Sequence, residues 1–183
     1  MNDNCFDRLS VTLDRIIKWI ENCDSKASTI LNVEGIILSV FLVTDYIRKI
    51  YTIFKYMTDK LNIWTGLYLL IFISSISMIL IGTTVLIRVL NAKINPNEYL
   101  TKGVKKDSLI YFASIAENES LESYSIKIKD CSPKEMEDDI ISQIYICSLI
   151  CKVKFDLYKK GVVIVQSGFV IFMITLIIGG VIV

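Results

Sequence analysis

The sequence predicts an all-α integral membrane protein with three transmembrane helices, two of which extend into a cytosolic helical cap. Three observations predict this class. Hydrophobic residues make up 53% of the 183 residues, several long runs contain no charge, and the chain has only two prolines. Because a proline inside a helix costs about 3 kcal/mol, long proline-free stretches permit long helices.

Three segments have the composition of membrane spans. Residues 63–87 and 161–183 contain no charged side chain, and each exceeds the roughly 20 residues that a helix needs to cross a bilayer. The first segment, residues 29–43, is shorter and contains Glu34. It reaches the required length when the small polar residues before it enter the interface.

These spans divide the chain into four parts. We expect residues 1–28 to form a cytosolic N-terminal helix and residues 29–90 to form two transmembrane helices joined by a short outer loop. Residues 91–160 are expected to form the cytosolic helical cap, and residues 161–183 the third transmembrane helix.

The two prolines mark helix boundaries. The sequence "INPNEYL" at 94–100 predicts the end of the second helix, because the residue before a proline disfavours helix. The sequence "SPKE" at 132–135 predicts a helix start, with Ser132 as the N-cap and Glu135 closing a capping box. We expect that helix to continue into the third span, and the proline-free first helix to run from the cytosol into the first span.

The positive charges predict the orientation. Of the 20 lysines and arginines, all but four lie before the first span or between the second and third spans. Loops rich in lysine and arginine stay in the cytosol. We therefore predict a multi-pass protein of the bacterial inner membrane with a cytosolic N-terminus.

Small and polar residues form a stripe along the first span. Ser25, Ser28, Asn32, Gly35 and Ser39 are separated by steps of three and four residues, which places them on one face of a helix. Two interpretations fit this pattern. The stripe lines a pore or an oligomer seam, or it packs closely against other helices of the same chain.

Glu34 lies on another face, roughly 140° from the middle of that stripe at 100° per residue. A carboxyl group in a span usually faces a partner, a cavity or a proton path, although close to the interface it can also reach the headgroups. Together with Asn32, Gly35 and Ser39, Glu34 is a candidate for the pore or a helix seam.

Basic residues with an aromatic neighbour are the candidate ligand-binding residues of the cap. Lysines bind anions such as nucleotide phosphates, and a tyrosine can stack on a base. The same residues also have an explanation without a ligand, because topology and anionic lipids favour lysines beside a membrane and aromatic residues fill cap cores. The candidates are Lys26, Lys102, Lys105, Lys106, Tyr111, Lys152 and Lys154.

The sequence contains no histidine, which excludes a Ser-His-Asp triad, a Cys-His pair and a histidine-containing zinc site. The acidic residues between Glu135 and Asp139 are typical of the first turns of a solvated helix rather than of a metal site. We therefore expect no enzymatic activity, no catalytic residue, no metal and no cofactor.

Several short motifs carry a family resemblance. Trp19 is followed by the sequence "DSKASTIL" at 24–31, which leads directly into the first span. The sequence "DSLIYFASIA" at 107–116 is followed by Tyr124, and "KVKF" at 152–155 precedes the last span. In this order, over roughly residues 8–180, the chain resembles the transmembrane effectors of bacterial Pycsar antiphage systems and their relatives in other nucleotide-signalling defence operons.

The resemblance implies a membrane-disrupting or channel-forming effector that causes abortive infection under the control of a nucleotide. In the Pycsar type the signal is a cyclic pyrimidine mononucleotide, which activates. In the related Hailong arrangement a short DNA oligomer holds a similar effector closed. The implied partners are that nucleotide, made by a neighbouring cyclase or nucleotidyltransferase, and the lipid bilayer.

We also expect a homo-oligomer, with a tetramer as the working number, because three spans per chain do not enclose an aqueous path. The alternative function is a membrane scaffold without a channel, in which the stripe packs helices and the lysines set the topology.

Overall fold

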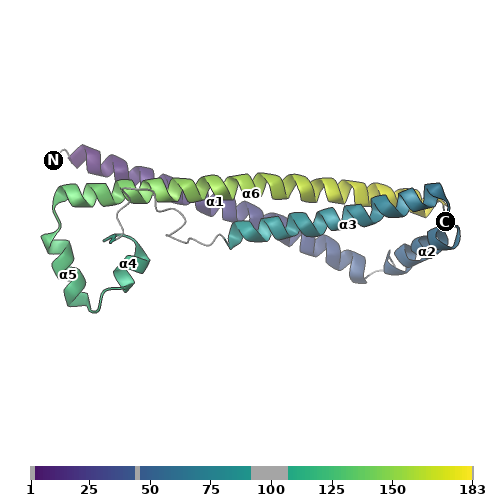
Figure 1. The fold of residues 1–183 in the computed structure, drawn as a ribbon, viewed down its shortest axis with the longest axis horizontal. Helices are drawn as coiled ribbons and strands as arrows, with labels where there is room; N and C mark the ends of the chain where they lie inside the picture. The colour runs from purple at the N-terminus through teal and green to yellow at the C-terminus, as the bar shows by residue number, and fades with distance from the viewer. Residues whose placement is uncertain (1–2, 44–45, 92–106, 183) are drawn as a thin grey trace. The chain divides into compact units, whose positions relative to one another are not determined.

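The computed structural model describes residues 3–43, 46–91 and 107–182 (Figure 1). Within these residues every regular element is a helix, and three helices are long and apolar enough to cross a membrane. The all-α class with three candidate spans is therefore confirmed. The helices are α1 (Asp3–Val43), α2 (Tyr46–Asp59), α3 (Ile63–Leu90), α4 (Phe112–Ala116), α5 (Leu121–Asp130) and α6 (Pro133–Ile182), of which α1, α3 and α6 are the candidate spans.

The chain divides into two compact units. We call residues 1–22 and 92–154 the cap unit, and residues 23–91 and 155–183 the membrane unit. Helices α1 and α6 are uninterrupted and contribute residues to both units. Because helix bounds alone do not define where a bilayer begins, the predicted four-part division stays a prediction.

Helix α6 begins at the predicted capping box. The backbone N–H of Ser132 donates to Glu135 Oε2 at 2.7 Å, and the backbone N–H of Glu135 donates to Ser132 Oγ at 3.3 Å. These two bonds satisfy donors that the first turn of a helix leaves without partners. The predicted start of this helix is confirmed.

Helix α3 begins with a second capping box. The Asn62 side chain accepts from the backbone N–H of Thr65 at 3.0 Å, and the Thr65 hydroxyl accepts from the backbone N–H of Asn62 at 2.7 Å. The helix ends at Leu90, with Asn91 as its C-cap. The segment "INPNEYL", predicted to end this helix, lies outside the described residues.

Helix α2 occupies most of the segment that was expected to be a short outer loop. It contacts α3 and buries Ile53 and Met57, whereas Arg48 and Lys49 on the same helix are exposed. Ile50, Ile53 and Met57 are separated by three and four residues, the spacing of one apolar helix face. This spacing was the sequence signal for an amphipathic helix.

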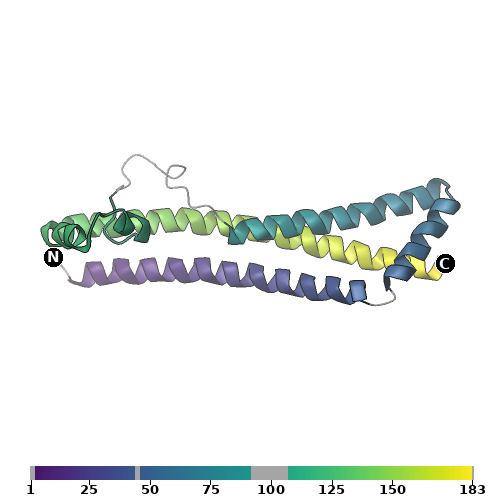
Figure 2. The same ribbon diagram turned by 90° about the horizontal axis from the view of Figure 1, so that it is seen from below.

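Glycines bring α3 and α6 into close contact in the membrane unit (Figure 2). A Cβ atom on Gly82 would lie 2.8 Å from the backbone nitrogen of Val165, and a Cβ atom on Gly168 would lie 3.0 Å from the backbone nitrogen of Ile79. A Cβ atom on Gly161 would lie 2.8 Å from Leu86 Cδ2. Only glycine allows backbones to approach this closely, as at other helix contacts in membranes.

The part of α1 in the membrane unit packs against this α3–α6 pair. Cys23 and Ala27 of α1 are buried in one cluster with Leu86 and Val89 of α3 and with Val165 of α6. Since Cys23 and Ala27 are one helical turn apart, they give α1 an inward face.

A row of contacting aromatic side chains connects the four helices of this unit. The ring centroids of Tyr46 and Phe41 are 5.5 Å apart, those of Phe41 and Phe172 are 5.6 Å apart, and those of Phe172 and Phe72 are also 5.6 Å apart. This row of aromatic rings extends from α2 through α1 and α6 to α3, and its centroid distances are typical of favourable aromatic pairs.

Gly82→Ala is expected to lower the free energy of unfolding by about 1–3 kcal/mol, because an added methyl group overpacks the α3–α6 contact. The matched control is Gly66→Ala on the same helix, where an added Cβ meets nothing within 4 Å among the described residues. This control should stabilise the helix by up to about 1 kcal/mol through helix propensity. Unfolding of both variants in detergent micelles measures the difference, and equal stabilities would contradict the close contact.

Candidate functional site

The polar stripe of α1 faces away from the chain's own helices. Asn32, Gly35 and Ser39 are exposed, and Ser28 is half-buried. A Cβ atom on Gly35 would meet nothing within 4 Å among the described residues. This arrangement argues against close packing within one chain, because the inward face of α1 carries other residues. The assignment of the stripe to a pore or an oligomer seam stays a prediction.

Glu34 is on the opposite side and is only 4% exposed. Its Oε2 atom lies 2.9 Å from the hydroxyl oxygen of Thr83 on α3, and that hydroxyl oxygen lies 2.8 Å from the carbonyl oxygen of Ile79. Glu34 Oε1 is buried and has no hydrogen-bond partner among the described residues. The carboxyl group therefore belongs to the contact between α1 and α3, and not to the exposed stripe.

The Thr83 hydroxyl carries one hydrogen, so it donates to Glu34 or to Ile79 at any one time. The neutral acid form of Glu34 uses both contacts, because its O–H donates to Thr83 Oγ1 while the Thr83 hydroxyl donates to the Ile79 carbonyl. In this form one polar group from each helix satisfies the other in an otherwise apolar contact.

The segment "DSLIYFASIA" is anchored in the cap unit through the backbone N–H and the carbonyl of Leu109. The backbone N–H of Leu109 donates to Asp139 Oδ2 at 2.7 Å, and the Leu109 carbonyl accepts from the Tyr124 hydroxyl at 2.8 Å. Ser108 Oγ accepts from the backbone N–H of Tyr111 at 3.0 Å. Two residues of the sequence motif, Ser108 and Tyr124, thus have a positioning role.

Asp139 corrects the interpretation of the acidic run as a solvated face. Its side chain is fully buried, at 0% exposure, and Oδ1 has no hydrogen-bond partner among the described residues. Gln143, one turn later on α6, is also buried. The sequence signal was the spacing of four residues between Asp139 and Gln143, which puts both on one face of α6. This face is buried in the cap unit.

The described structure covers four of the seven candidate ligand-binding residues, of which Lys26 belongs to the membrane unit and the other three to the cap unit. Lys102, Lys105 and Lys106 lie outside the described residues. Among the others, Lys26 and Lys152 are exposed, whereas Lys154 is buried. Tyr111 is half-buried, and its ring centroid lies 4.8 Å from that of Phe112. The assignment of a ligand to these seven residues stays a prediction.

Helix α1 also carries a pair of arginines, Arg8 and Arg15, that was not among the predicted site residues. Arg8 and Arg15 line a shallow groove of about 390 Å³ in the cap unit together with Asp7, Val11 and Thr12. The two arginines are two helical turns apart, which puts them on one face. The signal was this spacing of seven residues.

Comparison with known proteins gives two matches. The model of the Pycsar effector protein domain matches residues 8–179. The Pycsar effector protein GmPycTM from Gulbenkiania mobilis is 30% identical over 171 residues, which cover 89% of this chain and 87% of the relative. No solved structure matches the chain.

Thr83→Val is expected to lower the free energy of unfolding by about 1–3 kcal/mol, because the Glu34 carboxyl group loses its partner inside the helix contact. Adding Glu34→Met should recover most of this loss, since replacing both polar partners by apolar groups is nearly neutral. Unfolding of the single and double variants in detergent tests the pair. A double variant less stable than Thr83→Val would contradict it.

Asp139→Ala is expected to leave the half-buried N–H of Leu109 without its acceptor, at a cost of about 1 kcal/mol. Hydrogen–deuterium exchange should therefore become faster in residues 107–116. The control is Asp138→Ala at the neighbouring exposed position, which should leave exchange in this segment unchanged. Equal protection in the two variants would refute the positioning role of Asp139.

Proposed function

This chain belongs to the Pycsar effector family, as the sequence motifs predicted, and we propose that it forms a nucleotide-controlled pore in the bacterial inner membrane. Family membership makes it a transmembrane effector of antiphage signalling, in a system with a cyclic nucleotide cyclase. Opening of the pore would depolarise the membrane and stop phage propagation by stopping the cell.

The outward polar stripe of α1 is the observation that carries this proposal. The exposed amide of Asn32 lies in an apolar span, and a polar group facing hydrocarbon without a hydrogen-bond partner costs several kcal/mol. Water or a second copy of the chain removes this cost. A pore in which several copies turn Asn32, Gly35 and Ser39 toward its axis supplies both water and neighbouring copies as partners.

Pore formation requires several copies, because three candidate spans per chain do not enclose an aqueous path. The small residues of the stripe favour close approach of neighbouring α1 helices. We take a homotetramer as the working assembly, with the N-terminus and the cap unit in the cytosol.

Control by a nucleotide is assigned to the cap. A cyclic pyrimidine mononucleotide that activates is the first candidate, and a short DNA oligomer that restrains is the second. The exposed Lys152 and the groove between Arg8 and Arg15 offer positive charge for phosphate groups. A ligand shifts the pore only when it binds the open and closed states unequally, and the uninterrupted helices α1 and α6 can carry that difference between the units.

Asn32→Leu is expected to abolish depolarisation of cells that express the chain with its cyclase, because the pore loses its polar lining. Val33→Leu is the control, since Val33 is exposed on the apolar part of the same helix. A membrane-potential dye reports the outcome, and membrane fractionation shows whether both variants insert. Depolarisation by Asn32→Leu equal to that by the control would remove the stripe from the pore. A wild-type chain that never depolarises cells would favour the scaffold.

A further inference from the structure

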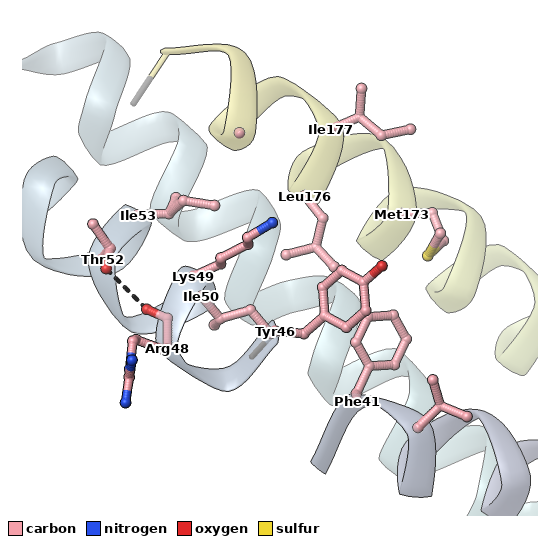
Figure 3. Close-up of a pocket in the computed structure, with 12 residues that line it drawn as sticks. Phe41, Tyr46, Arg48, Lys49, Ile50, Thr52, Ile53, Met173, Leu176 and Ile177 are labelled. Atoms are coloured by element: carbon pink, nitrogen blue, oxygen red, sulfur yellow. Dashed lines mark hydrogen bonds between the residues drawn. The ribbon is translucent and has the colours of Figure 1, made fainter. Parts of the chain in front are cut away.

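A groove of about 870 Å³ lies in the membrane unit between α2 and the ends of α1 and α6 (Figure 3). Its volume falls in the range of roughly 300–1,000 Å³ that is typical of ligand sites. Phe41 of α1 and Leu176 and Ile177 of α6 supply apolar walls. The groove is therefore large enough for a ligand with a long apolar part.

Four residues of α2 with polar side chains also line the groove, namely Tyr46, Arg48, Lys49 and Thr52. Figure 3 shows the Lys49 ammonium group and the Tyr46 hydroxyl group directed toward α6, whereas the Arg48 side chain points away from it. The Lys49 Nζ atom is 5.9 Å from the centroid of the Tyr46 ring. A cation beside a phenol can bind a phosphate through charge and hydrogen bonds.

The groove is placed at the level of lipid headgroups by its surroundings. Helix α2 exposes Tyr46 and Tyr51 beside basic residues, and Trp64 in the first turn of α3 is 77% exposed. Tyrosine and tryptophan are enriched at the two membrane–water interfaces, where their apolar rings and polar groups are both satisfied. A ligand in this groove would have one end in the hydrocarbon and the other among headgroups.

We propose that this groove binds one anionic glycerophospholipid, with an acyl chain against Phe41, Leu176 and Ile177 and its phosphate at Lys49 and Tyr46. An empty apolar groove of this size would forfeit van der Waals contacts along its walls. The bilayer supplies acyl chains at this site, and the positive charge of Lys49 complements a negative headgroup. The proposal depends on insertion in a membrane and not on the pore.

Two neighbouring glycines of α6 distinguish the groove from the packed interior. A Cβ atom on Gly179 would lie 2.8 Å from Ile53 Cγ2, so this position is closed by protein. A Cβ atom on Gly180, which lines the groove, would meet nothing within 4 Å among the described residues. A larger side chain at Gly180 would therefore occupy the place of the acyl chain without displacing protein atoms.

Lipid retention tests the site in the full-length protein. The purified chain is placed in nanodiscs of phosphatidylcholine or of phosphatidylcholine with phosphatidylglycerol, then returned to detergent, and retained lipid is counted by native mass spectrometry. The wild type should keep about one phosphatidylglycerol per chain in preference to phosphatidylcholine. Equal retention of the two lipids, or of neither, by the wild type alone would overturn the proposal.

Two pairs of variants locate the bound lipid. Lys49→Gln should weaken phosphatidylglycerol binding roughly tenfold, the effect of losing one charge-assisted hydrogen bond, whereas Lys55→Gln outside the groove should match the wild type. Gly180→Leu should abolish retention of either lipid, whereas Val181→Leu, at an 82% exposed position, should not. Retention by Lys49→Gln or Gly180→Leu at the level of its control would overturn the proposal. So would a change in oligomeric state with Gly180→Leu alone, since a second copy would then fill the groove.

Discussion

The membrane unit depends on one contact, the close approach of α3 and α6 at Gly82, Gly161 and Gly168. Lipid tails are as apolar as leucine side chains, so burial of apolar surface from water does not drive helices together inside a bilayer. Van der Waals contact between backbones takes that role, and it requires positions without a side chain. With α3 and α6 joined in this way, α1 has a surface to pack on through Cys23 and Ala27.

This packing decides which polar groups of α1 are satisfied within one chain. Glu34 turns inward and pairs through Oε2 with the Thr83 hydroxyl on α3, which offsets part of the free-energy cost of burying its carboxyl group. Asn32 turns outward, where the described residues of the chain do not cover it. Ser39 also turns outward, although its hydroxyl donates to the Ile36 carbonyl of the same helix at 2.8 Å. The asymmetry between the two faces is the physical basis for assigning an aqueous or self-associating role to the outward face only.

Much of the fold was predictable because its signals are local. The three spans follow from uninterrupted apolar length, and the start of α6 follows from Ser132 and Glu135. The α3–α6 contact was not predictable in the same way. In a span, the residues facing lipid and those facing other helices are both apolar, so no amphipathic pattern marks the inner face. Glycines and serines occur in all three spans, and the sequence does not say which of them meet.

The candidate site was predictable in part for a related reason. The spacing of Asn32, Gly35 and Ser39 placed them on one face, and the structure turned that face outward. Asp139 was misinterpreted because its partner, the backbone N–H of Leu109, is 30 residues away in the sequence and leaves no mark on the acidic run. Almost every residue type has a backbone N–H that can donate to a carboxylate. The sequence alone therefore does not show which residue pairs with Asp139.

Substituted-cysteine accessibility measures whether the outward face of α1 lines an aqueous path. In a background in which the five native cysteines are replaced, Asn32→Cys and Ser39→Cys are compared with Val33→Cys in liposomes to which cyclic UMP or cyclic CMP is added. If this face lines the pore, a membrane-impermeant thiosulfonate should label Asn32→Cys and Ser39→Cys and block ion flux, while Val33→Cys, which faces lipid, should remain unlabelled. Equal protection of all three positions, with ion flux unchanged, would contradict this assignment.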